Sequence, residues 1–194
     1  MKHPSNRELF DYWNTRRGER LAPERADIEP AAIRHVLGDT FVLEINGIGN
    51  HLFRIAGTRL CALFGRELKT ERFLPLWQPS AQAAVRELIA VVMEEKVGIV
   101  ASATGATSDD TLAPVGLEMV LLPLASTSSG EARVIGAMAP MAVPYWLGAK
   151  TVGPLALGMF RHIGAAADAP AAPRFRAAAG RLRHGLTVYD GGRI

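Results

Sequence analysis

The sequence contains only one cysteine, Cys61, among its 194 residues. One cysteine cannot form an internal disulfide, which is typical of proteins in a reducing compartment. The first twenty residues lack the apolar stretch of a signal peptide. The longest uncharged run, Val134–Ala149, is too short for a transmembrane helix and is interrupted by two prolines. We therefore expect a cytoplasmic protein that does not use a membrane.

Patterns of known catalytic and metal sites are also missing. The five histidines are scattered, and no two of them have the spacing of metal ligands on one helix. Neither Gly-x-Ser-x-Gly nor Ser-x-x-Lys occurs. The segment Gly47–Asn50 lacks the third glycine and the helix of a nucleotide-binding loop. We predict no catalytic residue, no metal and no cofactor, haem and flavin included.

The composition is that of a globular protein, with 48% hydrophobic and 21% charged residues. The net charge of +3 is unevenly distributed. Residues 161–194 carry six arginines and two aspartates, which gives +4, so the remaining residues carry −1. A neutral body with a basic tail does not favour nucleic-acid binding by the folded part. We divide the chain into an N-terminal helical extension (1–38), a core (39–145), and an apolar linker with a basic, mobile tail (146–194).

Hydrophobic periodicity predicts the order of the secondary-structure elements. A capping box at Ser5–Glu8 indicates an N-terminal amphipathic helix, and Glu29-Pro30 indicates a second helix. Glycines and asparagines at 46–50 predict a hairpin between two strands. The remaining pattern predicts these strands and helices: strands at 40–46 and 51–56, helices at 58–64 and 79–96, and strands at 98–104, 116–125 and 132–139.

The strand at 116–125 is apolar on both faces apart from Glu118, so both faces need a cover. Helices can cover one face. The other face requires either the N-terminal aromatic helix or a second subunit. The residues predicted to form this dimer or partner surface are Leu9, Phe10, Tyr12, Trp13, Val120 and Leu122.

This order of elements resembles a PAS domain, in which a five-stranded antiparallel sheet cups a pocket against short helices. Particular residues narrow the resemblance: Tyr12-Trp13, Arg16, Gly18, Pro23, Arg25, Asp27, Ile28, Pro30, Phe53–Thr58, Cys61, Phe64, Gly65–Leu68, Phe73 and Leu76-Trp77. With the terminal Leu186–Gly192, this string is similar to a family of stand-alone PAS-like proteins from alphaproteobacteria, first catalogued as a domain of unknown function. One departure is Lys69-Thr70, where the family pattern implies a glycine.

The resemblance implies an α+β fold with a PAS-like five-stranded antiparallel sheet, helices on one face, and an N-terminal amphipathic helix. It implies a sensing or scaffolding module and supplies no catalytic residue. We expect a non-enzymatic regulatory module that contacts a signalling protein of unknown identity, forms a homodimer, and is open to gating by a small ligand. The alternative is a receptor for an apolar or weakly acidic metabolite. An enzyme on a PAS-like scaffold is the remote alternative.

Strand alternation suggests which residues line such a ligand pocket: Phe41, Leu43, Phe53, Ile55, Leu60, Leu63, Phe64 and Trp77. Arg54 and Arg59 flank its presumed mouth. Each arginine could hold a carboxylate or phosphate ligand, or form a structural pair with Glu44 or Glu67. Cys61 has the sequence context of a small buried hydrophobic residue, and Asp109-Asp110 that of a solvated turn.

Overall fold

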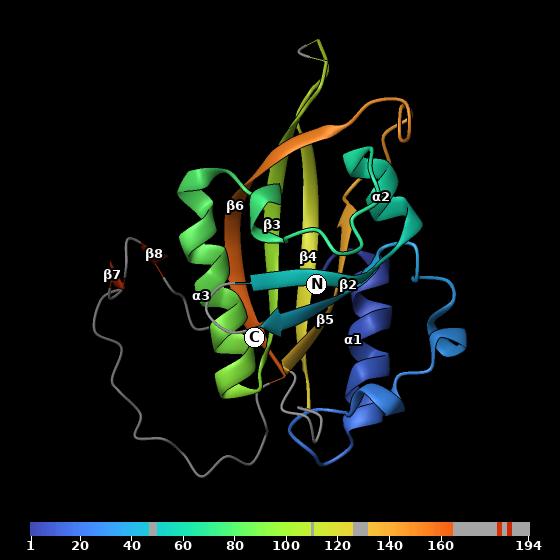
Figure 1. Cartoon of the computed structure of the whole chain (residues 1–194), viewed down its shortest axis with the longest axis vertical. Coiled ribbons are helices and arrows are strands. Elements are labelled where there is room, and N and C mark those ends of the chain that lie inside the picture. Colours follow the sequence, from blue (N-terminus) through green and yellow to red (C-terminus); the bar gives the residue numbers. More distant parts are fainter. Residues whose placement is uncertain (47–49, 110, 126–131, 165–181, 184–185, 188–194) are drawn as a thin grey trace.

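The computed structural model describes residues 1–46, 50–109, 111–125, 132–164, 182–183 and 186–187. Its centre is a six-stranded antiparallel sheet with helices on both faces (Figure 1). The strand order is β2-β1-β5-β4-β3-β6. The strands are β1 (Thr40–Asn46), β2 (Asn50–Ala56), β3 (Gly98–Thr107), β4 (Val115–Leu124), β5 (Ala132–Pro140) and β6 (Val152–Ile163). The predicted fold class, α+β with an antiparallel PAS-like sheet, is confirmed.

The sheet has one strand more than predicted. The five expected strands are all present, and β6 adds a sixth beside β3. Residues 152–163, which the sequence analysis assigned to a linker and tail, form this strand. Two further strands of two residues each, β7 (Leu182–Arg183) and β8 (Leu186–Thr187), pair with each other and not with the large sheet. Most of the predicted basic tail lies outside the described residues.

One face of the sheet, called the α3 face here, is covered by α2 (Thr58–Phe64), η3 (Leu74–Leu76) and α3 (Pro79–Glu95). The apolar residues of α3 repeat at helical spacing, so they form one stripe that packs on the sheet. The charged residues lie on the opposite side of the helix. α3 is followed by the C-cap residue Lys96, which adopts a left-handed conformation with φ 55°. Side chains from β1 to β6 and these helices form one apolar cluster.

The other face, called the α1 face, is covered by α1 (Pro4–Arg17) and by the 3₁₀ turns η1 (Arg25–Asp27) and η2 (Pro30–Ile33). Figure 1 shows α1 and α3 on opposite sides of the strands. The sequence allowed either the N-terminal helix or a second subunit to cover this face. In the structure, the chain's own N-terminal helix covers it. Leu9 and Trp13 of α1 are buried against Val120 and Leu122 of β4. These four residues do not lie on the surface, so their assignment to a dimer or partner surface is wrong for this structure.

The remaining two residues of that predicted surface, Phe10 and Tyr12, are half-buried and pack at the edge of the same cluster. The start of α1 also differs from the prediction. His3 is the N-cap, and its Nδ1 accepts a hydrogen bond from the backbone N–H of Ser5 at 3.2 Å. Ser5 itself is the second residue of the helix, and its hydroxyl bonds elsewhere.

The outer edge of β2 is paired with the loop that follows α2. Backbone N–H groups of Thr70 and Phe73 donate to the carbonyls of Phe53 and His51, both at 2.7 Å. The N–H of Phe53 donates to Glu71 O at 2.9 Å. This loop therefore continues the sheet for a short distance. Across the described part of the chain, no helix has the length and hydropathy needed to cross a membrane.

Candidate functional site

Most residues of the predicted ligand pocket are core residues. Seven of them belong to the apolar cluster of the α3 face: Phe41, Leu43, Phe53, Leu60, Leu63, Phe64 and Trp77. The ring of Phe73 lies 5.6 Å from those of Phe41 and Phe53 and 5.9 Å from that of Trp77, centroid to centroid. These are ordinary packing distances for aromatic rings. These seven side chains therefore pack in the core of the α3 face.

The eighth residue, Ile55, points outward instead and is 45% exposed. Its position follows from a register shift between β1 and β2. Val42 pairs with Ile55 and Leu43 pairs with Phe53, so no residue of β1 lies opposite Arg54 in the strand pairing. Such a bulge changes the direction of the side chains beside it. Ile55 therefore lies outside this apolar cluster, but it lines a surface groove together with Phe53 and Arg54.

The two arginines predicted at the pocket mouth are both in ion pairs. Arg54 Nε lies 3.0 Å from Glu44 Oε2, which confirms one of the two structural pairs considered for it. Arg59 pairs with Asp39, a partner that the sequence analysis did not consider. Asp39 is buried between the N-terminal extension (1–38) and β1.

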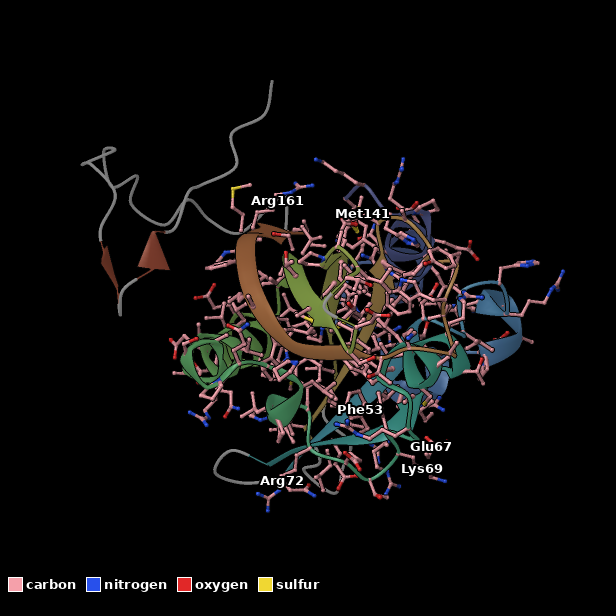
Figure 2. All side chains as sticks on the ribbon, turned by 90° about the horizontal axis from the view of Figure 1, so that it is seen from above. Phe53, Glu67, Lys69, Arg72, Met141 and Arg161 are labelled. Atoms are coloured by element: carbon pink, nitrogen blue, oxygen red, sulfur yellow. The ribbon has the colours of Figure 1, made fainter. Side chains whose placement is uncertain are left out.

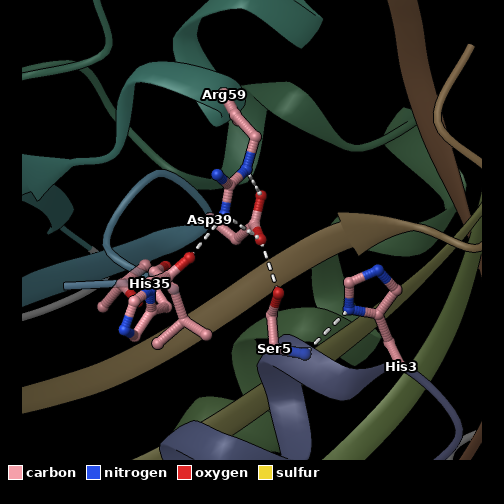
Figure 3. A network of polar contacts seen from close by, with 7 residues as sticks. His3, Ser5, His35, Asp39 and Arg59 are labelled. Atoms are coloured by element: carbon pink, nitrogen blue, oxygen red, sulfur yellow. Dashed lines mark hydrogen bonds and ion pairs between the residues drawn. The ribbon is translucent and has the colours of Figure 1, made fainter. Parts of the chain in front are cut away.

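Asp39 connects three segments of the chain (Figure 3). Its carboxylate accepts hydrogen bonds from Arg59 Nε at 2.8 Å and Arg59 Nη2 at 2.7 Å. It also accepts one from the Ser5 hydroxyl at 2.6 Å. The hydrogen bonds to Asp39 raise the pKa of Arg59 above its usual value. Since Ser5 belongs to α1 and Arg59 to α2, this carboxylate links a helix on each face of the sheet.

A groove of about 270 Å³ opens beside this network; we call it the Asp39 groove. Its polar side is formed by the network residues, and its other side is apolar. The lining residues are His3, Ser5, Asp39, Arg59, Leu63, Met138, Ala139, Pro140, Val143 and Leu147. A hollow with both kinds of wall can take an apolar side chain and orient a polar one.

The segment after β5 carries the largest exposed apolar side chains next to this groove. Met141, Val143 and Tyr145 are 47%, 69% and 90% exposed. Trp146 is buried in the core of the α3 face and anchors the segment. We call residues 141–147 the apolar segment. It is part of the uncharged run Val134–Ala149, for which we predicted no function from the sequence.

Two other residues behave as the sequence predicts. Cys61 is half-buried at the edge of the core, and burial raises the pKa of its thiol. Asp109 lies in a turn, where bonds from Thr111 and Lys150 lower the pKa of its carboxyl to about 2. Residue 110 lies outside the described residues. Among the residues described, no group of three or more His, Cys, Asp or Glu could hold a metal ion.

Comparison with known proteins agrees with this architecture. The family model described as PAS domain matches residues 1–139, from before α1 to the penultimate residue of β5. A search of the curated proteins gave no significant match. The matched segment includes the five expected strands and α1, and β6 lies beyond it. Since it covers well over half of the sequence, the chain belongs to the PAS domain family.

Proposed function

We propose that this chain is a non-enzymatic sensory or regulatory module that acts through contacts with a signalling protein. PAS domains are generally sensory or signalling modules and are typically non-catalytic. The ordered string of motifs from Tyr12-Trp13 to Leu76-Trp77 further supports membership of the stand-alone PAS-like family of alphaproteobacteria.

The observation that carries this proposal is the apolar segment beside the Asp39 groove. Three large apolar side chains there face solvent, although the chain buries most residues of this kind. Exposed apolar clusters next to polar groups are typical of protein interaction sites. Tyr145 provides an aromatic anchor with a hydroxyl group, a frequent feature of interface centres.

The hydrogen bonds of Asp39 provide a route from this surface to α1. A partner on the apolar segment contacts the groove that Ser5, Asp39 and Arg59 line. A change at Arg59 alters the bonds of Asp39, and therefore the support of Ser5 at the start of α1. Binding then shifts the population between two arrangements of α1 if the partner favours one of them.

Site-specific cross-linking in the native cell tests the interaction. A photo-reactive phenylalanine analogue at Tyr145 is expected to give a discrete cross-linked product. The same analogue at Glu87, an exposed residue of α3, serves as the matched control and gives none. The additional substitution Val143→Ser weakens the product at Tyr145 without changing the melting temperature, because Val143 is mostly exposed.

The products distinguish the possible partners. A product with twice the mass of the chain supports the expected homodimer, and light scattering must then show a dimer in solution. A product of another mass identifies a different protein as the partner. Equal products at both positions, or none at either, would contradict the proposal.

A further inference from the structure

The two edges of the large sheet differ in how much of them the chain itself covers. At β2, the loop after α2 bonds to the strand. At β6, Gln78 N donates to Leu155 O at 2.9 Å, and Trp77 forms a parallel bridge with the same residue. Among the described residues, no segment pairs with the outer edge of β6 beyond this point. Figure 2 shows Arg161, near the end of β6, on the opposite side of the molecule from Arg72 in the β2 loop.

The pairing of β6 with β3 shows which backbone groups of this edge are open. In an antiparallel pair, hydrogen-bonded and non-hydrogen-bonded positions alternate along each strand. Leu155, whose carbonyl points outward to Gln78, lies opposite Gly105 of β3. The next alternate residues of β3 pair with Leu157, Phe160 and His162. These three residues therefore direct their backbone N–H and C=O groups outward, away from β3.

The side chains on the two faces of this edge differ in character. Leu157 and Phe160 are half-buried and pack against the apolar cluster of the α3 face. Because successive side chains of a strand point to opposite faces, Met159 and Arg161 lie on the α1 face. Both are exposed, Met159 to 86%. An added strand would therefore contact apolar side chains on one face, and a methionine beside a cation on the other.

Positive charge is in excess at this corner of the molecule. β3 and β6 contain no acidic residue. Burial and the charges of Arg161, Arg7 and Lys2 lower the pKa of the Met1 amino group, so all three cations lie near it. The acidic residue that acts on the same group, Glu118, is 8% exposed and already accepts bonds from the backbone N–H groups of residues 2 and 3. In the described part of the chain, Arg161 forms no ion pair.

We propose that the outer edge of β6 binds an acidic, extended segment of another protein, which adds a strand to the sheet. Main-chain hydrogen bonds to Leu157, Phe160 and His162 supply the affinity, as in other cases of strand addition. Acidic side chains of the segment face Arg161, and its apolar side chains lie beside Phe160. A second copy of the chain fits this edge less well, because it would bring another Arg161 to the same short ladder without an acidic partner. This inference is independent of the protein contact proposed at the apolar segment.

Fluorescence polarisation with matched peptides tests the proposal. The probe is a labelled peptide of about eight residues in which glutamate and valine alternate, a length that matches the open edge. The matched peptide has lysine in place of each glutamate. The glutamate peptide is expected to bind one-to-one with a Kd of about 100 μM or lower, and about tenfold more tightly than the lysine peptide. N-methylation of its backbone amides removes the donors needed for strand addition, so it abolishes binding.

Variants of β6 separate the effect of charge from that of strand addition. Arg161→Glu is expected to weaken binding of the glutamate peptide about tenfold and to strengthen binding of the lysine peptide. His162→Pro removes an outward N–H group at an edge position that accepts proline, and weakens binding of both peptides. Arg72→Glu, which changes an exposed arginine in the β2 loop, is the matched control and leaves both Kd values unchanged. Thermal unfolding checks that the variants fold, and the N-methylated peptide makes the same test should His162→Pro fail to do so.

Three results would overturn the proposal. The first is absence of binding with the protein at about 1 mM, a concentration well above the expected Kd. The second is undiminished binding of the N-methylated peptide, or an equal loss of binding in Arg72→Glu, which indicates a general attraction of charge without an added strand. The third is a dimer in light scattering that His162→Pro dissociates, which indicates that a second copy occupies the edge. None of these results affects the cross-linking test at Tyr145.

Discussion

The two faces of the sheet are covered in different ways. The α3 face is closed by a large apolar cluster in which four aromatic rings, those of Phe41, Phe53, Phe73 and Trp77, contact one another. The α1 face has a smaller cluster, and buried polar bonds fasten the helix to the sheet. Trp13 Nε1 donates to Pro123 O at 2.8 Å, and Ser5 bonds to Asp39.

Glu118 shows the difference most clearly. It lies on β4, 8% exposed, and its carboxylate accepts hydrogen bonds from the backbone N–H groups of Lys2 and His3 and from Asn6 Nδ2. Packing alone depends little on pH, whereas bonds to a carboxylate depend on its ionisation. We therefore expect the stability of the α3 face to depend little on pH, and that of the α1 face to change with the ionisation of Glu118.

The largest expected effect is on the α3 face. Phe73→Ala removes the ring at the centre of the aromatic group and leaves a cavity, so the free energy of unfolding falls by about 3–5 kcal/mol. Urea denaturation followed by tryptophan fluorescence measures it. The matched variant on the α1 face, Phe10→Ala, costs about 1 kcal/mol because Phe10 is only half-buried. Equal losses in the two variants would refute the comparison between the faces.

The next effect concerns the pH dependence of the α1 face. Burial alone would raise the pKa of Glu118, but the hydrogen bonds from Lys2, His3 and Asn6 lower it below its ordinary value of 4.5. A lowered pKa in the folded state adds stability above pH 4.5, and this stability is lost as the pH falls from 4.5 through the folded pKa. Glu118→Gln is expected to cost about 1–3 kcal/mol at pH 7.

Denaturation curves at a series of pH values check this prediction. The difference between wild type and Glu118→Gln should shrink as the pH falls below 4.5, because the wild-type carboxyl becomes neutral. Glu87→Gln on the exposed side of α3 should match the wild type throughout. Hydrogen exchange should show that Glu118→Gln loosens α1 before α3. A difference that stays constant with pH would mean that Glu118 acts by packing and not by charge.

The smallest effect has the opposite sign. Thr70→Gly relieves the strain of the left-handed conformation and is expected to raise the free energy of unfolding by about 0.5–1 kcal/mol. Thr70→Ala should gain less, because alanine keeps a Cβ atom. Thermal unfolding of the three proteins measures the order. Destabilisation by glycine would show that the Thr70 side chain contributes contacts worth more than the strain.

The sequence predicts those helices and strands whose buried residues recur at a regular spacing or in a continuous apolar run. The stripe of α3 and the apolar runs of β4 and β5 are visible because these elements are covered by the rest of the chain. Gly57 explains one motif of the family resemblance. A Cβ atom there would collide with the backbone of Leu37 and Gly38, so the chain requires glycine after β2.

Other features leave no such signal. β6 contains Gly153, Pro154 and Gly158, and its pairing with β3 shifts register twice, so no alternation of apolar and polar residues survives. The pair of Asp39 and Arg59 joins residues twenty positions apart, and nothing local in the sequence indicates it. In contrast, the family pattern indicates a glycine where this chain has Lys69-Thr70. Thr70 has a positive φ of 69°, a conformation that glycine adopts without strain.

The loop on β2 also limits how copies of this protein can polymerise. Open strand edges are where sheets from different molecules join and grow into aggregates. At β2 the carbonyls of His51 and Phe53 already accept bonds from the chain's own loop, so an incoming strand must first displace it. Uncontrolled growth of the sheet is thereby blocked on this side, at the cost of a threonine in a conformation that suits glycine.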